Sequence, residues 1–356
     1  MIDQATRRQI LFSYGASEDT IDELLQYTRN DFKQSPTNEA PDDELFVDTW
    51  RAYADEARQT DAYTCLRRRL VQLAFPIRDG ISTTDAYLAA IRQGEVGTDN
   101  PGLTLQSPDA LEIRIHSSMA GSIPLIITSH RRDFVALVQA LVRRNEPVCI
   151  PDSMGACMVS GYNNWDRVRA HKREWERTNP DGRWEYEFQR LARRKELYQD
   201  RFIILSDGPY SGVSGSEMGI PEQIWREASL IIRREHECAH YYTRRILGSM
   251  RTNLFDELIA DFMGIVAVSG RFRSDWFLRF MGIEEDPSCC RSGRFLNYTL
   301  GVSKRGTPVL KRLLSDAARN LEEMVGRAIS PHPAAALKQL TRITLEELAD
   351  GMLRKG

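Results

Sequence analysis

The sequence has no long apolar run and no excess of charge of one sign. No stretch of 18 consecutive apolar residues occurs, so no transmembrane helix is expected. The opening residues, MIDQATRRQILFSYG, lack the apolar core of a secretory signal, which predicts a cytoplasmic protein. The 48 basic and 50 acidic residues give a net charge of −2. Such a balance argues against nucleic acid and against a membrane surface as the general partner.

Cysteine is scarce, and its spacing fits neither a disulfide framework nor a zinc ribbon. The six cysteines stand at positions 65, 149, 157, 238, 289 and 290 and form no CxxC pair. This usage is typical of a reduced, cytosolic protein. The pattern GxxxxGK[ST] is also absent, which excludes a P-loop for nucleoside triphosphates. With 356 residues, the chain can bury a large core and is expected to form two subdomains.

Three regions are expected along the chain. Residues 1–110 carry helical periodicity, residues 111–220 have α/β character with glycine-rich loops, and residues 221–356 return to helix. The expected fold is therefore mixed α/β and helix-rich. A small parallel or mixed sheet would lie between a helical N-terminal region and a helical, metal-binding C-terminal half.

Several elements can be predicted within these regions. Helices are expected at 18–34, 43–60, 61–74 and 131–144, and two packing helices near 308–327 and 332–354. Short apolar runs predict buried strands at 123–128, 146–151 and 201–206.

The stretch His236-Glu237-Cys238-Ala239-His240 points to a definite chemistry. On a helix, positions i and i+4 share a face, so both imidazoles can reach one metal ion. Glu237 lies about 100° around the helix from His236, close enough to touch a water molecule on that ion. Two ligands and a general base in this order form the HExxH arrangement of zinc hydrolases. A long helix from Pro221 to Gly248 would carry it, because proline suits a first turn and glycine suits a C-terminal cap.

A second helix is expected from about Asn253, and its sequence LFDELIADFMGIVAV adds two carboxylates on one face, Glu257 and Asp261. A carboxylate from a neighbouring helix is a common third zinc ligand. A further carboxylate can orient a metal-bound histidine through its second ring nitrogen. Ala260 and Gly264 keep this helix slim, so that it can approach the first one closely.

Together the two helices resemble the gluzincin class of zinc metallopeptidases, whose pattern is HExxH followed by ExxxD on a later helix. The resemblance covers about residues 230–265 and implies a zincin-like site. It makes His236, His240 and Glu257 the ligands of Zn²⁺, Glu237 the general base, and Asp261 the partner of a histidine. The separation of 17 residues (257 − 240) is short for that class but suffices for a helix–turn–helix. The metzincin pattern does not fit, because it needs glycine and histidine where Thr243 and Ile246 stand.

Other candidates for the site come from loops and from the motif helix. Loops after the expected strands supply three candidate substrate-binding residues, His130, Ser153 and Ser211. The stretch 163–165 adds a fourth, Asn164. Tyr210 and Arg244 are candidate donors to a developing oxyanion, and Arg233 is a candidate partner for a substrate carboxylate. Each has an ordinary alternative: turn chemistry for the loop residues, core packing for Tyr210 and a salt bridge for either arginine.

The predicted function is zinc-dependent hydrolysis of a peptide or another amide bond, with Glu237 as general base. One alternative is an enzyme that acts on a small metabolite, including one that uses Fe²⁺ in a site of two histidines and one carboxylate for redox chemistry. Another alternative is a metal-stabilised binding module without catalysis. The sequence leaves the oligomeric state and the role of the N-terminal region open.

Overall fold

The computed structural model describes residues 2–33, 41–97, 101–283 and 293–351 and divides the chain into two compact units. Unit 1 comprises residues 1–40 and 209–356, and unit 2 comprises residues 41–208. These boundaries differ from the three regions expected from the sequence. The reason is that the first two helices pack with the C-terminal helices and not with their neighbours in the chain. Arg7 pairs with Glu346 at 2.9 Å, for example, and the Tyr14 hydroxyl donates to Asp316 at 3.0 Å.

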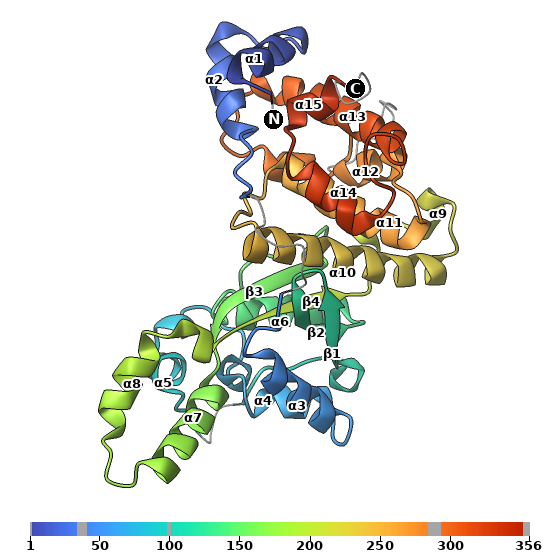
Figure 1. The fold of residues 1–356 in the computed structure, drawn as a ribbon. Helices are drawn as coiled ribbons and strands as arrows, with labels where there is room; N and C mark the ends of the chain where they lie inside the picture. The colour runs from blue at the N-terminus through green and yellow to red at the C-terminus, as the bar shows by residue number, and fades with distance from the viewer. Residues whose placement is uncertain (1, 34–40, 98–100, 284–292, 352–356) are drawn as a thin grey trace. The chain divides into compact units, whose positions relative to one another are not determined.

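Unit 2 contains a four-stranded sheet with the strand order β1-β2-β4-β3 (Figure 1). The strands are β1 (Glu112–Ser118), β2 (Gly121–Thr128), β3 (Ala156–Asn163) and β4 (Gln199–Ser206). The central pair, β2 and β4, is parallel, whereas β1 and β3 run antiparallel to their neighbours. The sheet is therefore mixed and lies in the middle of a helix-rich chain, as the sequence predicts.

Helices and a buried polar cluster complete unit 2. Its α-helices are α3 (Val47–Ala57), α4 (Ala62–Arg67), α5 (Asp85–Gln93), α6 (Arg131–Leu141), α7 (Trp165–Thr178) and α8 (Trp184–Ala192). Its 3-10 turns are η1 (Val71–Ala74), η2 (Ile81–Thr83), η3 (Pro108–Ala110) and η4 (Lys195–Leu197).

Asp200 on β4 is buried and accepts hydrogen bonds from Trp50 at 2.8 Å and from Arg167 at 2.7 Å. The burial of this carboxylate is therefore compensated.

The prediction of a strand at 146–151 is wrong, and the strands β1 and β3 were not predicted. Pro147 and Pro151 bound the apolar run, and neither can donate to a sheet. Side chains satisfy the backbone there: Gln139 donates to the Val148 carbonyl at 2.8 Å, and Arg131 donates to the Pro151 carbonyl at 2.7 Å. Strand β1 lacks an apolar run, and its residues are only exposed or half-buried, so its composition gives no strong strand signal.

Unit 1 is helical in its described residues. Its α-helices are α1 (Gln4–Ser13), α2 (Glu18–Tyr27), α9 (Gly215–Met218), α10 (Glu222–Ile246), α11 (Leu254–Ser269), α12 (Ser274–Met281), α13 (Gly306–Met324), α14 (Pro333–Leu340) and α15 (Leu345–Ala349). Two 3-10 turns, η5 (Tyr210–Gly212) and η6 (Arg294–Tyr298), join them. The single helix expected at 332–354 is in fact two, because Thr344 caps a new helix by accepting the Glu347 N–H. No helix in the described part of the chain is long and apolar enough to cross a bilayer.

The two helices that carry the predicted metal ligands begin and end where the sequence signals them. Pro221 precedes the first turn of α10, and Gly248, at φ 65°, follows its last turn. Asn253 caps α11 by accepting the N–H groups of Phe255 and Asp256. Helix α11 packs against α10 at Gly264, where a Cβ atom would lie 2.7 Å from the Ile232 carbonyl oxygen (Figure 1). The absence of a side chain at Gly264 therefore sets how closely the helices approach.

Replacing this glycine tests the close approach. Gly264→Ala is expected to lower the free energy of unfolding by about 1–2 kcal/mol, because the clash outweighs the better helix propensity of alanine. The matched control is Ala267→Val at an exposed position of α11, which should change that free energy by no more than about 0.5 kcal/mol. Urea unfolding measures both. Equal stability of Gly264→Ala and the original protein would contradict the packing.

Candidate metal centre

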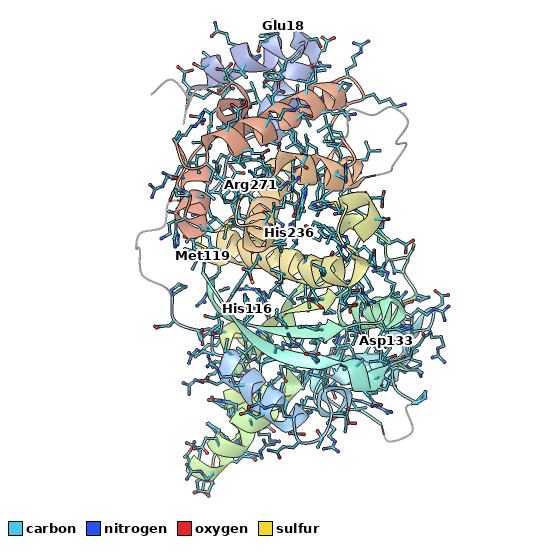
Figure 2. The ribbon with its side chains drawn as sticks, turned by 90° about the vertical axis from the view of Figure 1, so that its right-hand side faces the viewer. Glu18, His116, Met119, Asp133, His236 and Arg271 are labelled. Carbon is cyan, nitrogen blue, oxygen red and sulfur yellow. The ribbon has the colours of Figure 1, made fainter. Side chains whose placement is uncertain are left out.

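Ligand atoms of three side chains, His236 and His240 on α10 and Glu257 on α11, lie within 4.8 Å of one another. Figure 2 labels His236, the first of them. The Nε2 atoms of His236 and His240 are 3.1 Å apart. Glu257 presents one carboxylate oxygen to each ring, Oε1 at 3.3 Å from His240 Nε2 and Oε2 at 3.5 Å from His236 Nε2. In a tetrahedral zinc site with bonds of 2.0–2.1 Å, the edges between ligand atoms are about 3.3 Å. The three separations are thus close to those that zinc requires.

The burial of these groups also fits a cation. The three residues are at most 6% exposed. Two imidazole nitrogens at 3.1 Å can share one proton at most, and Glu257 Oε2 is buried without a hydrogen-bond partner among the described residues. A buried acceptor without a partner is costly, and a divalent cation would remove that cost. The donor set of two nitrogens and one carboxylate is one that zinc commonly takes.

The electrostatics of the metal-free cluster follow from the same contacts. Burial lowers the pKa of His240, but the hydrogen bond and charge of Glu257 outweigh it and raise that pKa to about 9. Burial likewise raises the pKa of Glu257, but the hydrogen bond from His240 and the charges of the two histidines and Arg294 lower it to about 2. Without a metal ion, the cluster therefore holds a proton on His240 at neutral pH.

Asp261 fixes the other side of the His236 ring. It lies one turn after Glu257 on α11, and its Oδ1 is 2.7 Å from His236 Nδ1. A carboxylate there accepts the Nδ1–H, which leaves the lone pair of Nε2 facing His240 and Glu257. The structure thus brings together His236, His240, Glu257 and Asp261.

Glu237 follows His236 on α10 and is half-buried. Burial raises its pKa, and the negative charge of Glu257 raises it further, against the lowering effect of the two histidines and Arg294. A raised pKa brings a carboxylate closer to the range in which it can both accept and release a proton near neutral pH.

Tyr210 lies on the opposite side of His236 from the position expected of an oxyanion donor. Its hydroxyl donates to Asp261 Oδ1 at 2.5 Å and lies 3.1 Å from His236 Nδ1. The hydroxyl is therefore behind the ring, away from Nε2. The expectation that Tyr210 donates to a substrate oxygen is corrected accordingly: its contacts hold Asp261 and His236.

The two arginines of α10 that were predicted as site residues, Arg233 and Arg244, have different surroundings. Arg233 is buried, donates to the Pro209 carbonyl at 2.6 Å, and places its guanidinium 5.6 Å from the centre of the Tyr210 ring. Arg233 therefore packs against Tyr210, which does not fit the expected contact with a substrate carboxylate. Arg244 is exposed.

Ser211, at φ 54°, has a buried Oγ without a hydrogen-bond partner in the described part of the chain.

Three predicted pocket residues belong to unit 2, whereas the metal residues belong to unit 1. Asn164 is fully buried: its Oδ1 caps α7, and its Nδ2 donates to Asp200 at 2.6 Å. The prediction that Asn164 binds substrate is wrong, because its polar atoms are used inside unit 2. His130 stands just before α6, 3.9 Å from Asp133, and Ser153 is half-buried in the turn before β3.

Arg294 was missed in the sequence analysis. It is the first residue of η6, is 8% exposed, and donates from Nη2 to Asp261 Oδ2 and from Nη1 to the Tyr210 hydroxyl at 3.3 Å. Nη1 is also 3.8 Å from Glu257 Oε2. Arg294 is 33 residues away from Asp261 in the chain, so no helical or motif spacing connects the two.

Tyr298, the last residue of η6, was also missed. Burial raises the pKa of its hydroxyl, and the charge of Glu257 and a hydrogen bond with Glu257 raise it further. Its backbone carbonyl accepts a hydrogen bond from Tyr27 at 2.8 Å. The turn η6 therefore contributes side chains beside Glu257 and Asp261 of α11.

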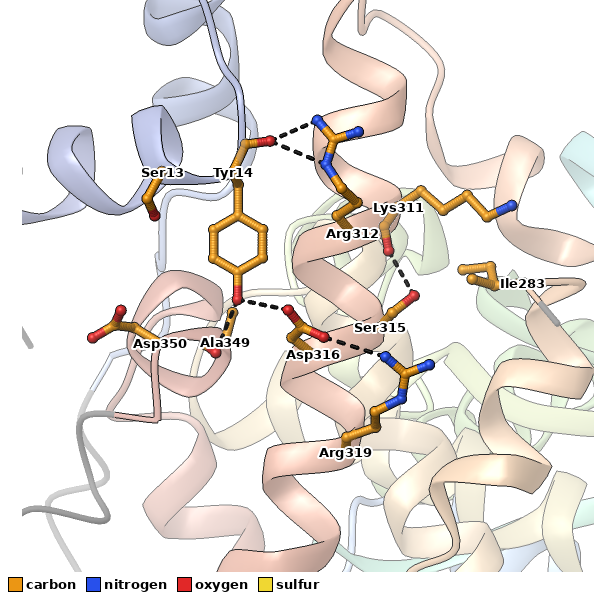
Figure 3. Close-up of a pocket in the computed structure, with 10 residues that line it drawn as sticks. All are labelled: Ser13, Tyr14, Ile283, Lys311, Arg312, Ser315, Asp316, Arg319, Ala349 and Asp350. Atoms are coloured by element: carbon orange, nitrogen blue, oxygen red, sulfur yellow. Dashed lines mark hydrogen bonds and ion pairs between the residues drawn. The ribbon is translucent and has the colours of Figure 1, made fainter. Parts of the chain in front are cut away.

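A separate hollow of unit 1 contains none of the predicted site residues. It has a volume of about 820 Å³ and lies between the end of α1, α13 and the end of α15 (Figure 3). Several of its polar groups bind one another: Arg312 donates to the Tyr14 carbonyl at 2.6 Å, and Arg319 pairs with Asp316 at 3.3 Å. The first contact joins the end of α1 to α13, whereas the second lies within α13.

Zinc affinity should depend on pH in the direction set by His240. A protonated imidazole cannot bind zinc, so the apparent affinity is expected to rise about tenfold per pH unit and to level off only near pH 9, where the pKa of about 9 lies. Competition with a chelator of known protonation measures this profile. His332→Gln, at an exposed position, is the control and should leave the profile unchanged. Levelling near 6.5, the ordinary histidine pKa, would contradict the coupling to Glu257.

The comparisons with known proteins give one match. A model described as a family of unknown function (DUF7005) matches residues 9–352. Searches of curated proteins and of solved structures found no match. The chain therefore belongs to the DUF7005 family.

Proposed function

We propose that the protein is a zinc-dependent hydrolase that cleaves a peptide bond or another amide bond. One observation carries the proposal. The Nε2 atoms of His236 and His240 are 3.1 Å apart, each has one oxygen of Glu257 within 3.3–3.5 Å, and Glu237 adjoins His236 on α10. Two histidine ligands with a glutamate between them as general base are the HExxH arrangement of metal-assisted hydrolysis.

Each residue has a definite task in such a reaction. His236, His240 and Glu257 would hold the zinc ion, which would supply the Lewis acidity that acidifies a water molecule and polarises a carbonyl group. Glu237 accepts the proton from the attacking water and delivers it to the leaving nitrogen. Asp261 holds the His236 ring through Nδ1, at 2.7 Å.

The same donor set supports a second candidate. Two histidines and one carboxylate also bind Fe²⁺ in non-haem iron enzymes, which leave open positions for redox chemistry. The carboxylate of Glu237 beside the ligands favours hydrolysis, because a proton acceptor is needed there and not for iron binding. Metal analysis of protein purified without chelators separates the two, since one equivalent of iron and no zinc would exclude the zinc proposal.

Glu237→Gln tests the general base. The variant should bind one equivalent of zinc, because the ligands are intact, and should lose about 10²–10⁴-fold in turnover, because the amide accepts no proton. A peptide library and a panel of acyl amides, scored by mass spectrometry, supply the substrates.

The matched control is Glu227→Gln, at an exposed position of the same helix, which should retain full activity. Unchanged turnover in Glu237→Gln, or no hydrolysis of any substrate by the zinc-loaded protein, would rule out the proposed reaction.

His240→Ala tests the ligand assignment. Removal of one of three ligands should reduce bound zinc from one equivalent to below about a tenth after dialysis against a weak chelator. Plasma mass spectrometry measures the metal, with His332→Ala as the control that keeps one equivalent. Stoichiometric zinc in His240→Ala would show that the ligands lie elsewhere.

A further inference from the structure

We propose that Arg294 is a positioning residue of the metal centre: it fixes Asp261, and through Asp261 the ring of His236, so that the three ligands are assembled before a metal ion binds. This inference rests on the proposed metal site but not on any reaction at that site.

Arg294 is held in place by its own element. It opens η6, whose last residue, Tyr298, accepts a hydrogen bond from the Tyr27 hydroxyl at 2.8 Å. The same Tyr27 hydroxyl accepts the Leu254 N–H, at the start of α11, at 3.0 Å. Tyr27 thus ties η6 to the helix that carries Glu257 and Asp261. The guanidinium of Arg294 is therefore delivered to a fixed place beside α11.

The two oxygens of the Asp261 carboxylate have different partners. Nη2 of Arg294 donates to Oδ2, while Oδ1 receives the Tyr210 hydroxyl at 2.5 Å and His236 Nδ1 at 2.7 Å. With both oxygens occupied, the plane of the carboxylate cannot turn. Since the ring of His236 bonds to one of these oxygens, its orientation follows that of Asp261.

The charges give a second reason for an arginine at this place. Glu257 and Asp261 are one turn apart on α11, and both are at most 1% exposed. Two carboxylates at this spacing repel each other, and the repulsion is stronger away from water. Nη2 contacts Asp261 Oδ2, and Nη1 lies 3.8 Å from Glu257 Oε2, so one guanidinium faces both. A planar fork can serve two acceptors in this way, whereas an ammonium group offers a single point of charge.

Arg294 also leaves the ligand face clear. It contacts Asp261 at the oxygen that His236 does not use, and it faces Glu257 Oε2 from 3.8 Å, beyond hydrogen-bond distance. The two imidazole Nε2 atoms face each other at 3.1 Å, and the two oxygens of Glu257 face them at 3.3 and 3.5 Å. Arg294 therefore supports the ligands without taking the place of the metal.

The test measures zinc affinity of the full chain by competition with a chromophoric chelator, with no substrate present. Arg294→Met should weaken zinc binding by roughly 10- to 100-fold, the usual effect of losing a residue that orients a metal ligand. Arg294→Lys keeps the charge but not the fork, and it should fold and still lose affinity. The matched control is Arg273→Met, whose side chain pairs with Asp275 at 2.6 Å outside the metal cluster. It should stay within about twofold of the original affinity.

A double variant separates positioning from general stability. If Arg294 acts through Asp261, then in an Asp261→Asn background the further change Arg294→Met should cost less than about threefold in zinc affinity. The visible spectrum of Co²⁺-loaded protein should change in Arg294→Met and not in Arg273→Met, since it reports on the geometry of the ligands.

Three results would overturn the proposal. They are unchanged zinc affinity in Arg294→Met, the same loss with and without Asp261, and failure of both Arg294 variants to fold with or without zinc. Because no turnover is measured, these outcomes are separate from the failure of Glu237→Gln to abolish hydrolysis.

Discussion

The contact between α10 and α11 is the constraint on which the rest of the candidate site depends. One helix contributes two imidazoles and the other a carboxylate, so the ligand atoms converge only if the helix axes are close. Gly264 permits that approach, because any side chain there would meet the backbone of Ile232. The geometry of the cluster in unit 1 therefore depends directly on how closely α10 and α11 pack.

The buried charges around this contact balance one another through a few atoms. Asp261 has both oxygens engaged, one by Arg294 and one by Tyr210 and His236. Glu257 has one oxygen facing His240 and another that is buried without a hydrogen-bond partner among the described residues. A buried carboxylate oxygen in that state needs a positive charge. Asp261 is thus fully hydrogen-bonded behind His236, whereas Glu257 Oε2 faces the Arg294 guanidinium from 3.8 Å, beyond hydrogen-bond distance.

The sequence predicts what is encoded locally. The spacing of His236 and His240 is a single helical turn, and that of Glu257 and Asp261 is another, so helix periodicity alone groups each pair. Arg294 could not be found in this way, because 33 residues separate it from Asp261. Tyr210 could be named from its loop but not oriented, since only the folded η5 puts its hydroxyl behind His236. The apolar run at 146–151 suggested a strand, but its prolines and the side chains that bond its carbonyls keep it out of the sheet.

The discontinuity of unit 1 has a consequence for how the protein is made. Unit 2 is one uninterrupted stretch, residues 41–208, whereas α1 and α2 find their partners only after residue 209. Arg7 can pair with Glu346, and Tyr27 can donate to the Tyr298 carbonyl, only after these later residues have been translated. On the ribosome, domains generally fold as they emerge, so unit 2 can form while the first helices are still without partners. Helices α1 and α2 precede unit 2 in the chain but can pack only after it, and the cluster around His236 can be completed only after η6 has been translated.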